Sequence, residues 1–135
     1  MKIGFTCGSF DLIHPGHILM LQDCKNFCDY LIVAIQIDPT LDRPDKNTPV
    51  QSIDERALMV KSIKYVDKIL TYNTEQELYD MLVDISPDVR VVGSDWKGNS
   101  NFTGGDLDIQ IHYHNRNHNY STTNLRKRVF KAENK

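Results

Sequence analysis

The feature that most constrains the fold is an apolar run, Tyr30–Ile37, which is rich in β-branched residues and shows no polar alternation. A strand with one face in water alternates apolar and polar residues, whereas an unbroken run of this length is typical of a strand buried on both faces. Such a strand needs packed layers above and below it. The run is also far too short to cross a bilayer, which takes about 20 residues, so we expect no membrane partner.

Strand-like and helix-like segments alternate on both sides of this run. The strands are predicted over Lys2–Cys7, Tyr30–Ile37, Val66–Thr71, Val89–Val92 and Ile109–Tyr113. The helices are predicted over Gly16–Phe27, Ser52–Ile63, Thr74–Ile85 and a last segment that ends near Lys131. This alternation predicts an α/β fold in which a five-stranded parallel sheet carries helices on both faces. The length fits a single domain over residues 1–135.

Local signals support the helix positions. Two capping boxes, Ser52–Glu55 and Thr74–Glu77, mark the starts of the second and third helices. The last helix is expected to begin at one of the three hydroxyl residues at positions 121–123. Within it, the spacing of Leu125 and Val129 predicts that both side chains face the core.

Composition narrows the classes of function. The net charge of −2, from 16 Lys+Arg and 18 Asp+Glu, does not call for a nucleic-acid partner. Three cysteines, an odd number without framework spacing, indicate a reducing compartment. No apolar leader follows Met1, and we therefore expect a cytoplasmic protein.

The turn between the first strand and the first helix carries the strongest functional signal, GSFDLIHPGH, residues 8–17. His14 and His17 are three residues apart on either side of Gly16, so both imidazoles can face one point above the helix N-terminus. Free N–H groups there attract anions, and two added donors suit a phosphate whose charge changes during a reaction. A single histidine would be read as an ordinary surface residue. The turn lacks the Gly-Lys-Ser/Thr of a P-loop, which disfavours simple NTP hydrolysis.

Two further turns are expected to meet the first one, because ligands bind at the carboxyl ends of parallel strands. These are residues 93–98 and 114–121. Arg116 and the hydroxyls of residues 121–123 at a helix start could form a second phosphate site, although such hydroxyls are usually only helix caps. The basic run Arg126–Arg128 is expected to be a solvated helix face, and Trp96 is expected to pack within its loop.

Four segments of the chain resemble the motifs of the cytidylyltransferase-like nucleotidyltransferases, in the family's order and over nearly the whole length. The turn at 8–17 resembles the family's H-x-G-H signature, and Lys64–Ile69 resembles R-Y-V-D-x-V/I. Gly93–Gly98 resembles G-x-D-W-x-G, and Arg116–Thr123 resembles R-T-x-G-I-S-T-T. The motif set is most similar to that of members that use glycerol-3-phosphate. The resemblance implies a single Rossmann-like domain.

The resemblance also implies a reaction. CTP and a small phosphomonoester, glycerol-3-phosphate or a similar phospho-alcohol or phospho-sugar, would give a CDP-alcohol and pyrophosphate. Mg²⁺ would accompany the nucleotide, held by its phosphates and by no protein side chain. A homodimer formed through the second-helix region is expected. Such a transfer needs no general base, because the acceptor phosphate already carries a nucleophilic oxygen; the protein must align two anions and neutralise developing charge.

The same resemblance assigns roles to individual residues. His14, His17, Lys46 and Arg116 would be the catalytic residues: the histidines would stabilise departing pyrophosphate, and Lys46 would close over the phosphates. The nucleotide would be bound by Ser9, Phe10, Gly16, Asp95, Ser121, Thr122 and Thr123. Arg56 and Lys64 occupy two further family positions.

Departures from the family pattern leave alternatives open. Lys64 replaces the family's arginine and loses its bidentate geometry. The tract Glu75–Leu78 lacks the lysine that glycerol-3-phosphate members use for the acceptor. An adenylyltransferase of the same superfamily is a rival, because the H-x-G-H turn serves both bases and the Arg116–Thr123 turn, which alone favours CTP, is altered. A non-catalytic nucleotide-binding module is another rival. A metal-binding or redox module is a third, with two candidate sets of ligands: Cys24 and Cys28; and His112, His114 and His118.

Overall fold

The computed structural model describes residues 1–98 and 101–134, apart from the side chain of Asp95. Its centre is one five-stranded sheet in the order β3-β2-β1-β4-β5. Every neighbouring pair is parallel, which confirms the predicted sheet. The strands are β1 (Ile3–Gly8), β2 (Tyr30–Gln36), β3 (Lys68–Tyr72), β4 (Val89–Gly93) and β5 (Gln110–His114).

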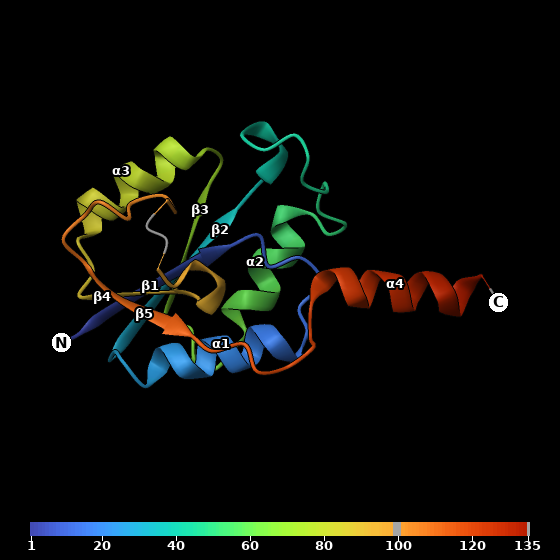
Figure 1. Cartoon of the computed structure of the whole chain (residues 1–135), viewed down its shortest axis with the longest axis horizontal. Coiled ribbons are helices and arrows are strands. Elements are labelled where there is room, and N and C mark those ends of the chain that lie inside the picture. The colour runs from blue at the N-terminus through green and yellow to red at the C-terminus, as the bar shows by residue number, and fades with distance from the viewer. Residues whose placement is uncertain (99–100, 135) are drawn as a thin grey trace.

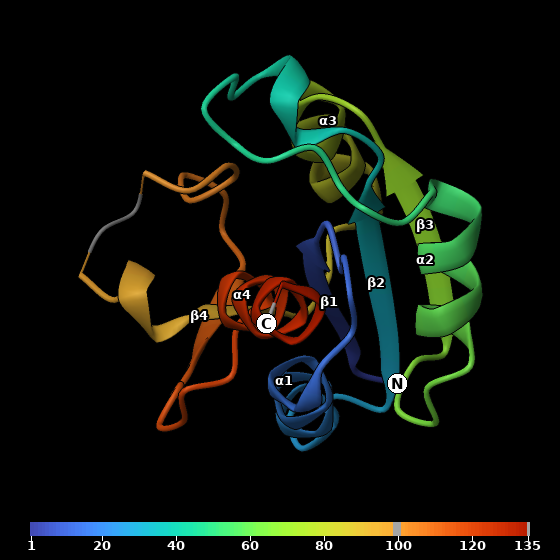
Figure 2. The ribbon, with the colours of Figure 1, turned by 90° about the vertical axis from the view of Figure 1, so that its right-hand side faces the viewer.

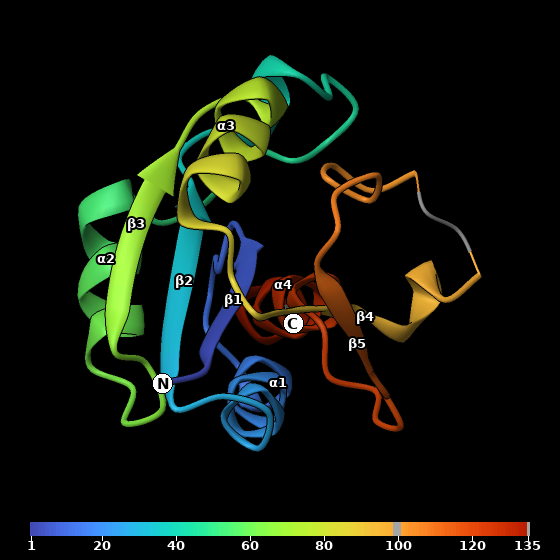
Figure 3. The ribbon, with the colours of Figure 1, turned by 90° about the vertical axis from the view of Figure 1, so that its left-hand side faces the viewer.

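Helices cover both faces of this sheet, as the sequence predicted. They are α1 (Pro15–Lys25), α2 (Ile53–Lys61), α3 (Glu75–Ile85) and α4 (Thr122–Glu133), with short 3₁₀ turns η1 (Pro39–Leu41) and η2 (Ser94–Trp96). Helix α2 lies nearer the viewer in Figure 2 and α3 in Figure 3, so these two helices are on opposite faces. The chain thus forms three layers, with the sheet in the middle.

The apolar run that begins at Tyr30 forms β2, which is buried on both faces. Leu31, Val33 and Ile35 pack into the core under α1 and α2, whereas Ile32 and Ala34 pack into the core under α3. None of the five is more than 6% exposed. An unbroken apolar run is what two opposed cores require of a central strand.

Several element boundaries differ from those predicted. The predicted capping box at the start of α2 is complete: the Ser52 side chain accepts from the Glu55 N–H, and the Glu55 carboxylate accepts from the Ser52 N–H. The capping box predicted at the start of α3 is incomplete. The Thr74 side chain accepts from the Glu77 N–H, but the Glu77 carboxylate accepts from the N–H of Asn73 rather than from that of Thr74. Strand β3 begins two residues after Val66, because the carboxylate of the intervening Asp67 accepts from the backbone of β2 at Leu31 and ends the turn there.

The prediction that Val129 faces the core is wrong. Val129 is 55% exposed and the neighbouring Phe130 is 69% exposed, and α4 has no buried residue. Leu125 is only half-buried. Figure 1 shows the reason: α4 extends away from the sheet, and the C-terminus lies at its far end. Periodicity identifies an apolar stripe on a helix but not what, if anything, covers it.

Two further observations concern the chain as a whole. No helix in the described residues is long and apolar enough to span a membrane. Cys7, Cys24 and Cys28 are all free thiols. Cys24 and Cys28 are buried, and burial is the main cause that raises the pKa of each thiol, so both are inert core groups.

Candidate active site

The turn between β1 and α1 is organised by its two histidines. His14 is the N-cap of α1, and its Nδ1 accepts a hydrogen bond from the Gly16 N–H at 3.0 Å. His17 reaches back, and its Nδ1 accepts from the His14 N–H at 3.1 Å. Two imidazoles thus form the reciprocal capping box that Ser and Glu form elsewhere. Because each Nδ1 is an acceptor, a neutral imidazole carries its proton on Nε2 and is a donor there.

Both imidazoles are held in the neutral form. Burial, reinforced by the positive charge of His14 and Arg116 when present, lowers the pKa of His17 to about 3. Burial and the proximity of Arg116 and His118 also lower the pKa of His14. The ring centroids of His14 and His17 are 3.9 Å apart, so one proton on the pair strongly disfavours a second. Near pH 7 the site presents two neutral donors that an incoming phosphate would polarise.

Gly16 is required by packing in this turn. A Cβ added to it would lie 2.8 Å from Cε1 of His14 and 2.9 Å from Cε1 of His118. Both distances are shorter than van der Waals contact permits. The glycine therefore makes room at the start of α1 for two imidazoles, that of His14, which follows β1, and that of His118, which follows β5.

The turn also contains left-handed backbone held by a buried carboxylate. Phe10 and Leu12 have φ values of 51° and 52°, which non-glycine residues rarely adopt. Between them Asp11 is only 4% exposed, and its carboxylate accepts from the N–H groups of Val50 and Gln51 and from Arg126. These bonds fix the strained turn to the start of α2. No local sequence pattern marks Asp11, and the prediction that Arg126 lies on a solvated face is wrong, because Arg126 pairs with this buried carboxylate.

Arg56 supports the same turn from behind. Its side chain is 2% exposed and donates to the carbonyls of Ser9 at 3.0 Å and Gln36 at 2.7 Å. It also donates to the carbonyls of Ile37 and Gln51. All five N–H groups of an arginine are suited to such carbonyl clusters. Arg56 therefore positions the carboxyl ends of β1 and β2 rather than contacting a substrate.

Two pockets open at the carboxyl ends of the strands. The larger has a volume of about 600 Å³ and the smaller about 290 Å³. They share residues at the ends of β1 and β4, including Gly8, Ser9 and Trp96. This is where the strand order reverses, since β1 lies between β2 and β4, and such a switch point is the usual ligand site of α/β sheets.

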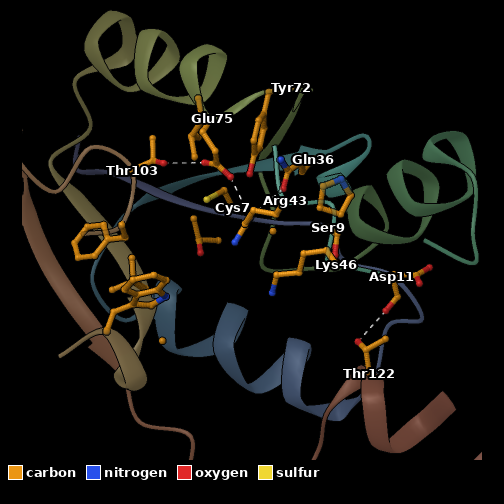
Figure 4. A pocket seen from close by; sticks show the side chains of 18 of the residues that line it. Cys7, Ser9, Asp11, Gln36, Arg43, Lys46, Tyr72, Glu75, Thr103 and Thr122 are labelled. Atoms are coloured by element: carbon orange, nitrogen blue, oxygen red, sulfur yellow. Dashed lines mark hydrogen bonds and ion pairs between the residues drawn. The ribbon is translucent and has the colours of Figure 1, made fainter. Parts of the chain in front are cut away.

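The predicted site residues divide between the two pockets. The smaller pocket is lined by Phe10, His14, Gly16, His17 and Arg116. The larger one is lined by Lys46, Thr122 and Thr123, and Figure 4 shows the Lys46 side chain extending into it. Ser9 lines both.

The three hydroxyls at the start of α4 have different duties. Ser121 is the N-cap, and its Oγ accepts from the Asn124 N–H. The hydroxyl of Thr122 donates to the Asp11 carbonyl at 3.1 Å, a contact visible in Figure 4. Thr123 is exposed at the cleft. The helix start is thereby tied to the histidine turn, and both N-termini face the two pockets.

Some predicted residues lie elsewhere. Lys64 is in the connection between α2 and β3, with its ammonium 5.2 Å from the Tyr65 ring, and it lines neither pocket. Asp95 belongs to η2, but its side chain lies outside what the structure describes. Trp96 packs edge-on against Phe102, as expected, and also lines both pockets.

The three histidines considered as zinc ligands do not gather around one point. His112 Nε2 and His114 Nδ1 both bond Oδ2 of Asp23, at 2.9 and 2.8 Å. His118 instead lies beside Gly16 in the smaller pocket. Among residues 1–98 and 101–134, no group of three or more His, Cys, Asp or Glu side chains could hold a metal ion. His118 therefore lines the candidate site, although its spacing from His112 and His114 suggested only a metal ligand.

The geometry defines a class of protein. Paired neutral donors, two helix N-termini and several cations surround a switch-point cleft, and none of them is arranged as a nucleophile with its base. Such an arrangement is suited to binding and transferring phosphoryl-type groups, and the fold is that of the Rossmann-like nucleotidyltransferases.

Comparison with known proteins agrees. The family described as cytidylyltransferase-like matches residues 5–128. The glycerol-3-phosphate cytidylyltransferase of Bacillus subtilis (strain 168) is 35% identical over 130 residues, which cover 96% of this chain and 98% of that protein. The chain belongs to the cytidylyltransferase-like family and is a nucleotidyltransferase.

Other relatives are longer or more distant. The bifunctional protein HldE of Acidiphilium cryptum (strain JF-5) is 40% identical over 96 residues, covering 70% of this chain. The match spans only 20% of that protein. The lipopolysaccharide core biosynthesis protein of Thermoplasma volcanium GSS1 has a TM-score of 0.69 and 23% identity, covering 90% of this chain and 99% of its own. That similarity establishes the fold alone.

Proposed function

We propose that the protein transfers a cytidylyl group from CTP to a small phosphomonoester, glycerol-3-phosphate or a similar phospho-alcohol or phospho-sugar, and releases pyrophosphate. The observation that carries the proposal is the histidine capping box at the switch point, with two Nε2–H donors at a helix N-terminus. The 35% identity to a glycerol-3-phosphate cytidylyltransferase over nearly the full length of both chains supports the choice of nucleotide and acceptor.

The residues would act by position and charge. The acceptor phosphate attacks the α-phosphorus of CTP, the bond to the bridging oxygen breaks, and pyrophosphate leaves with the electron pair. His14 and His17 donate from Nε2 to phosphate oxygens as negative charge grows on the leaving group. Arg116 and the start of α4 bind the nucleotide, and Lys46 reaches the reacting phosphates from the far wall of the cleft. Because the acceptor phosphate already carries a nucleophilic oxygen, aligning the two anions in this way is sufficient and no general base is needed.

We propose Mg²⁺ as the metal that accompanies CTP, held by the nucleotide phosphates. Two described carboxylates line the larger cleft, Asp11 and Glu75, and both are already engaged by hydrogen-bond donors. The donor set therefore fits a metal that arrives on the phosphates better than one held by side chains. When bound, Mg²⁺ supplies charge neutralisation of the phosphate oxygens.

We also propose a cytoplasmic homodimer that associates through α2. This helix exposes two large apolar side chains, Leu58 at 67% and Met59 at 46%. Light scattering of the wild type and of a Leu58→Lys variant measures the oligomeric state. A monomeric wild type would remove the dimer from the proposal.

The decisive experiment is a pyrophosphate-release screen of CTP and ATP against a panel of phosphomonoesters, with Mg²⁺ present. We expect release with CTP and a phosphorylated small alcohol or sugar. Preference for ATP would select the adenylyltransferase alternative. Absence of release with every pair would overturn the transferase proposal.

A further inference from the structure

A buried arginine on β4 lies beside the larger cleft. Arg90 is 3% exposed and lines that cleft. It pairs in register with Phe5, which packs in the core under α3, so Arg90 lies on the same face of the sheet. A single charged residue within an apolar strand carries no local signal of a function, so Arg90 was not among the predicted site residues.

A loop encloses the head of this side chain. The guanidinium carbon lies 5.1 Å from the centre of the Phe102 ring, and Nη1 donates to the Thr103 carbonyl. Gly104 adopts a φ of +82°, and a Cβ there would lie 3.0 Å from Nη1. The loop therefore fits closely around the guanidinium: it contributes the ring of Phe102, the carbonyl of Thr103 and Gly104, where a side chain would crowd Nη1.

Within the part of the chain that the structure describes, the guanidinium has no anionic partner. No carboxylate of the described residues lies within ion-pair distance of Arg90. Its Nε is buried without a hydrogen-bond acceptor, and Nη2 has only the Cys7 thiol at 3.8 Å, a weak contact. Burying a cation without a counter-charge is costly, so an unpaired arginine at a cleft indicates an anion that is not part of the chain.

The position of Cys7 shows which anion this would be. Cys7 lines both pockets and lies two residues before Ser9, one of the residues predicted to bind the nucleotide. An oxyanion on Nη2 of Arg90, which faces Cys7, would lie beside the nucleotide phosphates bound there. In a transfer between two phosphates, the acceptor phosphate must occupy that place.

The cleft beyond Arg90 is built for hydroxyl groups. The Glu75 carboxylate is held between Arg43 at 3.0 Å and the Thr103 hydroxyl at 2.8 Å (Figure 4). Arg43 also donates to the Gln36 side chain at 3.5 Å. Because the charge of Glu75 is balanced by Arg43, its free lone pairs can accept from neutral donors without repelling a bound molecule.

We propose that Arg90 binds the phosphate of the acceptor and that Glu75 accepts hydrogen bonds from its hydroxyls, so that the acceptor is a phosphorylated polyol. This inference rests on the proposed function. It also explains how the tract Glu75–Leu78 can lack the lysine expected there: the positive charge for the acceptor comes from β4 instead of α3.

Steady-state kinetics with glycerol-3-phosphate varied at saturating CTP and Mg²⁺ test the proposal. Arg90→Met should raise the KM for glycerol-3-phosphate at least about tenfold, as expected for the loss of a charge-assisted hydrogen bond. The KM for CTP should stay within about threefold, and Arg90→Lys should fall between wild type and Arg90→Met. Arg128→Met, which removes an exposed cation from α4, is the matched control and should behave as wild type. Equal changes in both KM values, or none, would overturn the assignment.

A binding measurement separates this inference from the proposed function. With a non-hydrolysable CTP analogue present, glycerol-3-phosphate should raise the melting temperature of the wild type but not that of Arg90→Met. Glycerol alone should have no such effect. Stabilisation of both proteins alike, or of neither, would overturn the role of Arg90 even if pyrophosphate release is observed. If Arg90→Met does not fold, as judged by circular dichroism, Arg90→Lys carries the same two tests.

Discussion

The turn at residues 8–17 and the segment at residues 41–48 face the same cleft but are held in opposite ways. In the turn, the buried Asp11 carboxylate accepts three hydrogen bonds, and His14 and His17 form the capping box at the start of α1. In the segment, every residue is exposed. Asp42 and Arg43 bond Glu75, and the Thr48 carbonyl accepts from Arg126. Lys46 between them has, among the described residues, a single bond, from its backbone N–H to the Arg43 carbonyl. Under the proposed function, the turn holds the groups that must be in place before the substrate arrives, and the segment carries Lys46, the group proposed to close over it.

The largest expected effect comes from removing the support behind the turn. Arg56→Met leaves four carbonyls without their buried donor, and we expect the free energy of unfolding to fall by about 3 kcal/mol or more. Urea denaturation measures it, with Arg128→Met as the exposed-arginine control, expected within about 0.5 kcal/mol of wild type. An Arg56→Met protein as stable as the control would show that the turn does not depend on Arg56.

The histidines should be next in size, and their effect should be on turnover. His17→Ala and His14→Ala are each expected to lower kcat by about 100-fold or more, because a preorganised donor to developing charge is lost. His14→Ala also removes an N-cap, which costs about 1 kcal/mol of stability.

A second substitution at each position separates the two roles. His14→Asn supplies another good N-cap, and His17→Gln another acceptor for the capping box. Both should restore stability without restoring kcat. Near-normal turnover in either alanine variant would remove that histidine from the mechanism.

The sequence predicted the residues of the turn at 8–17 far better than the buried contacts that hold the turn in place. The two histidines, the glycine between them and the parallel sheet follow from local pattern and spacing. The duties of Asp11 and Arg56 depend on partners about forty residues away in the chain, which no local pattern encodes. The outward course of α4 and the position of His118 beside Gly16 likewise depend on tertiary packing.

A pH dependence of stability should distinguish the turn from the rest of the molecule. The folded-state pKa of His17, about 3, lies below its ordinary value of 6.5, so on acidification the unfolded chain takes up the proton first. The histidine has no effect above pH 6.5, and it destabilises the folded state increasingly as the pH falls from 6.5 towards 3. The wild type should therefore lose more stability between pH 7 and pH 4 than His17→Gln does, as measured by urea denaturation at each pH. Parallel losses in the two proteins would contradict the lowered pKa.

The smallest expected effect on stability is that of Lys46→Ala, and it tests the other half of the comparison. The side chain is exposed and makes no hydrogen bond or ion pair with the described residues, so the melting temperature should change by less than about 1 °C. Activity should respond differently: kcat/KM should fall by about tenfold or more, because the cation that reaches the transferring phosphates is lost. Lys46→Arg should recover part of this, since charge is kept while the shape of the donor changes. Melting curves and steady-state kinetics on the three proteins give both readouts. A drop of several degrees in Lys46→Ala would make Lys46 a structural residue, and the segment at 41–48 would then be held as firmly as the turn.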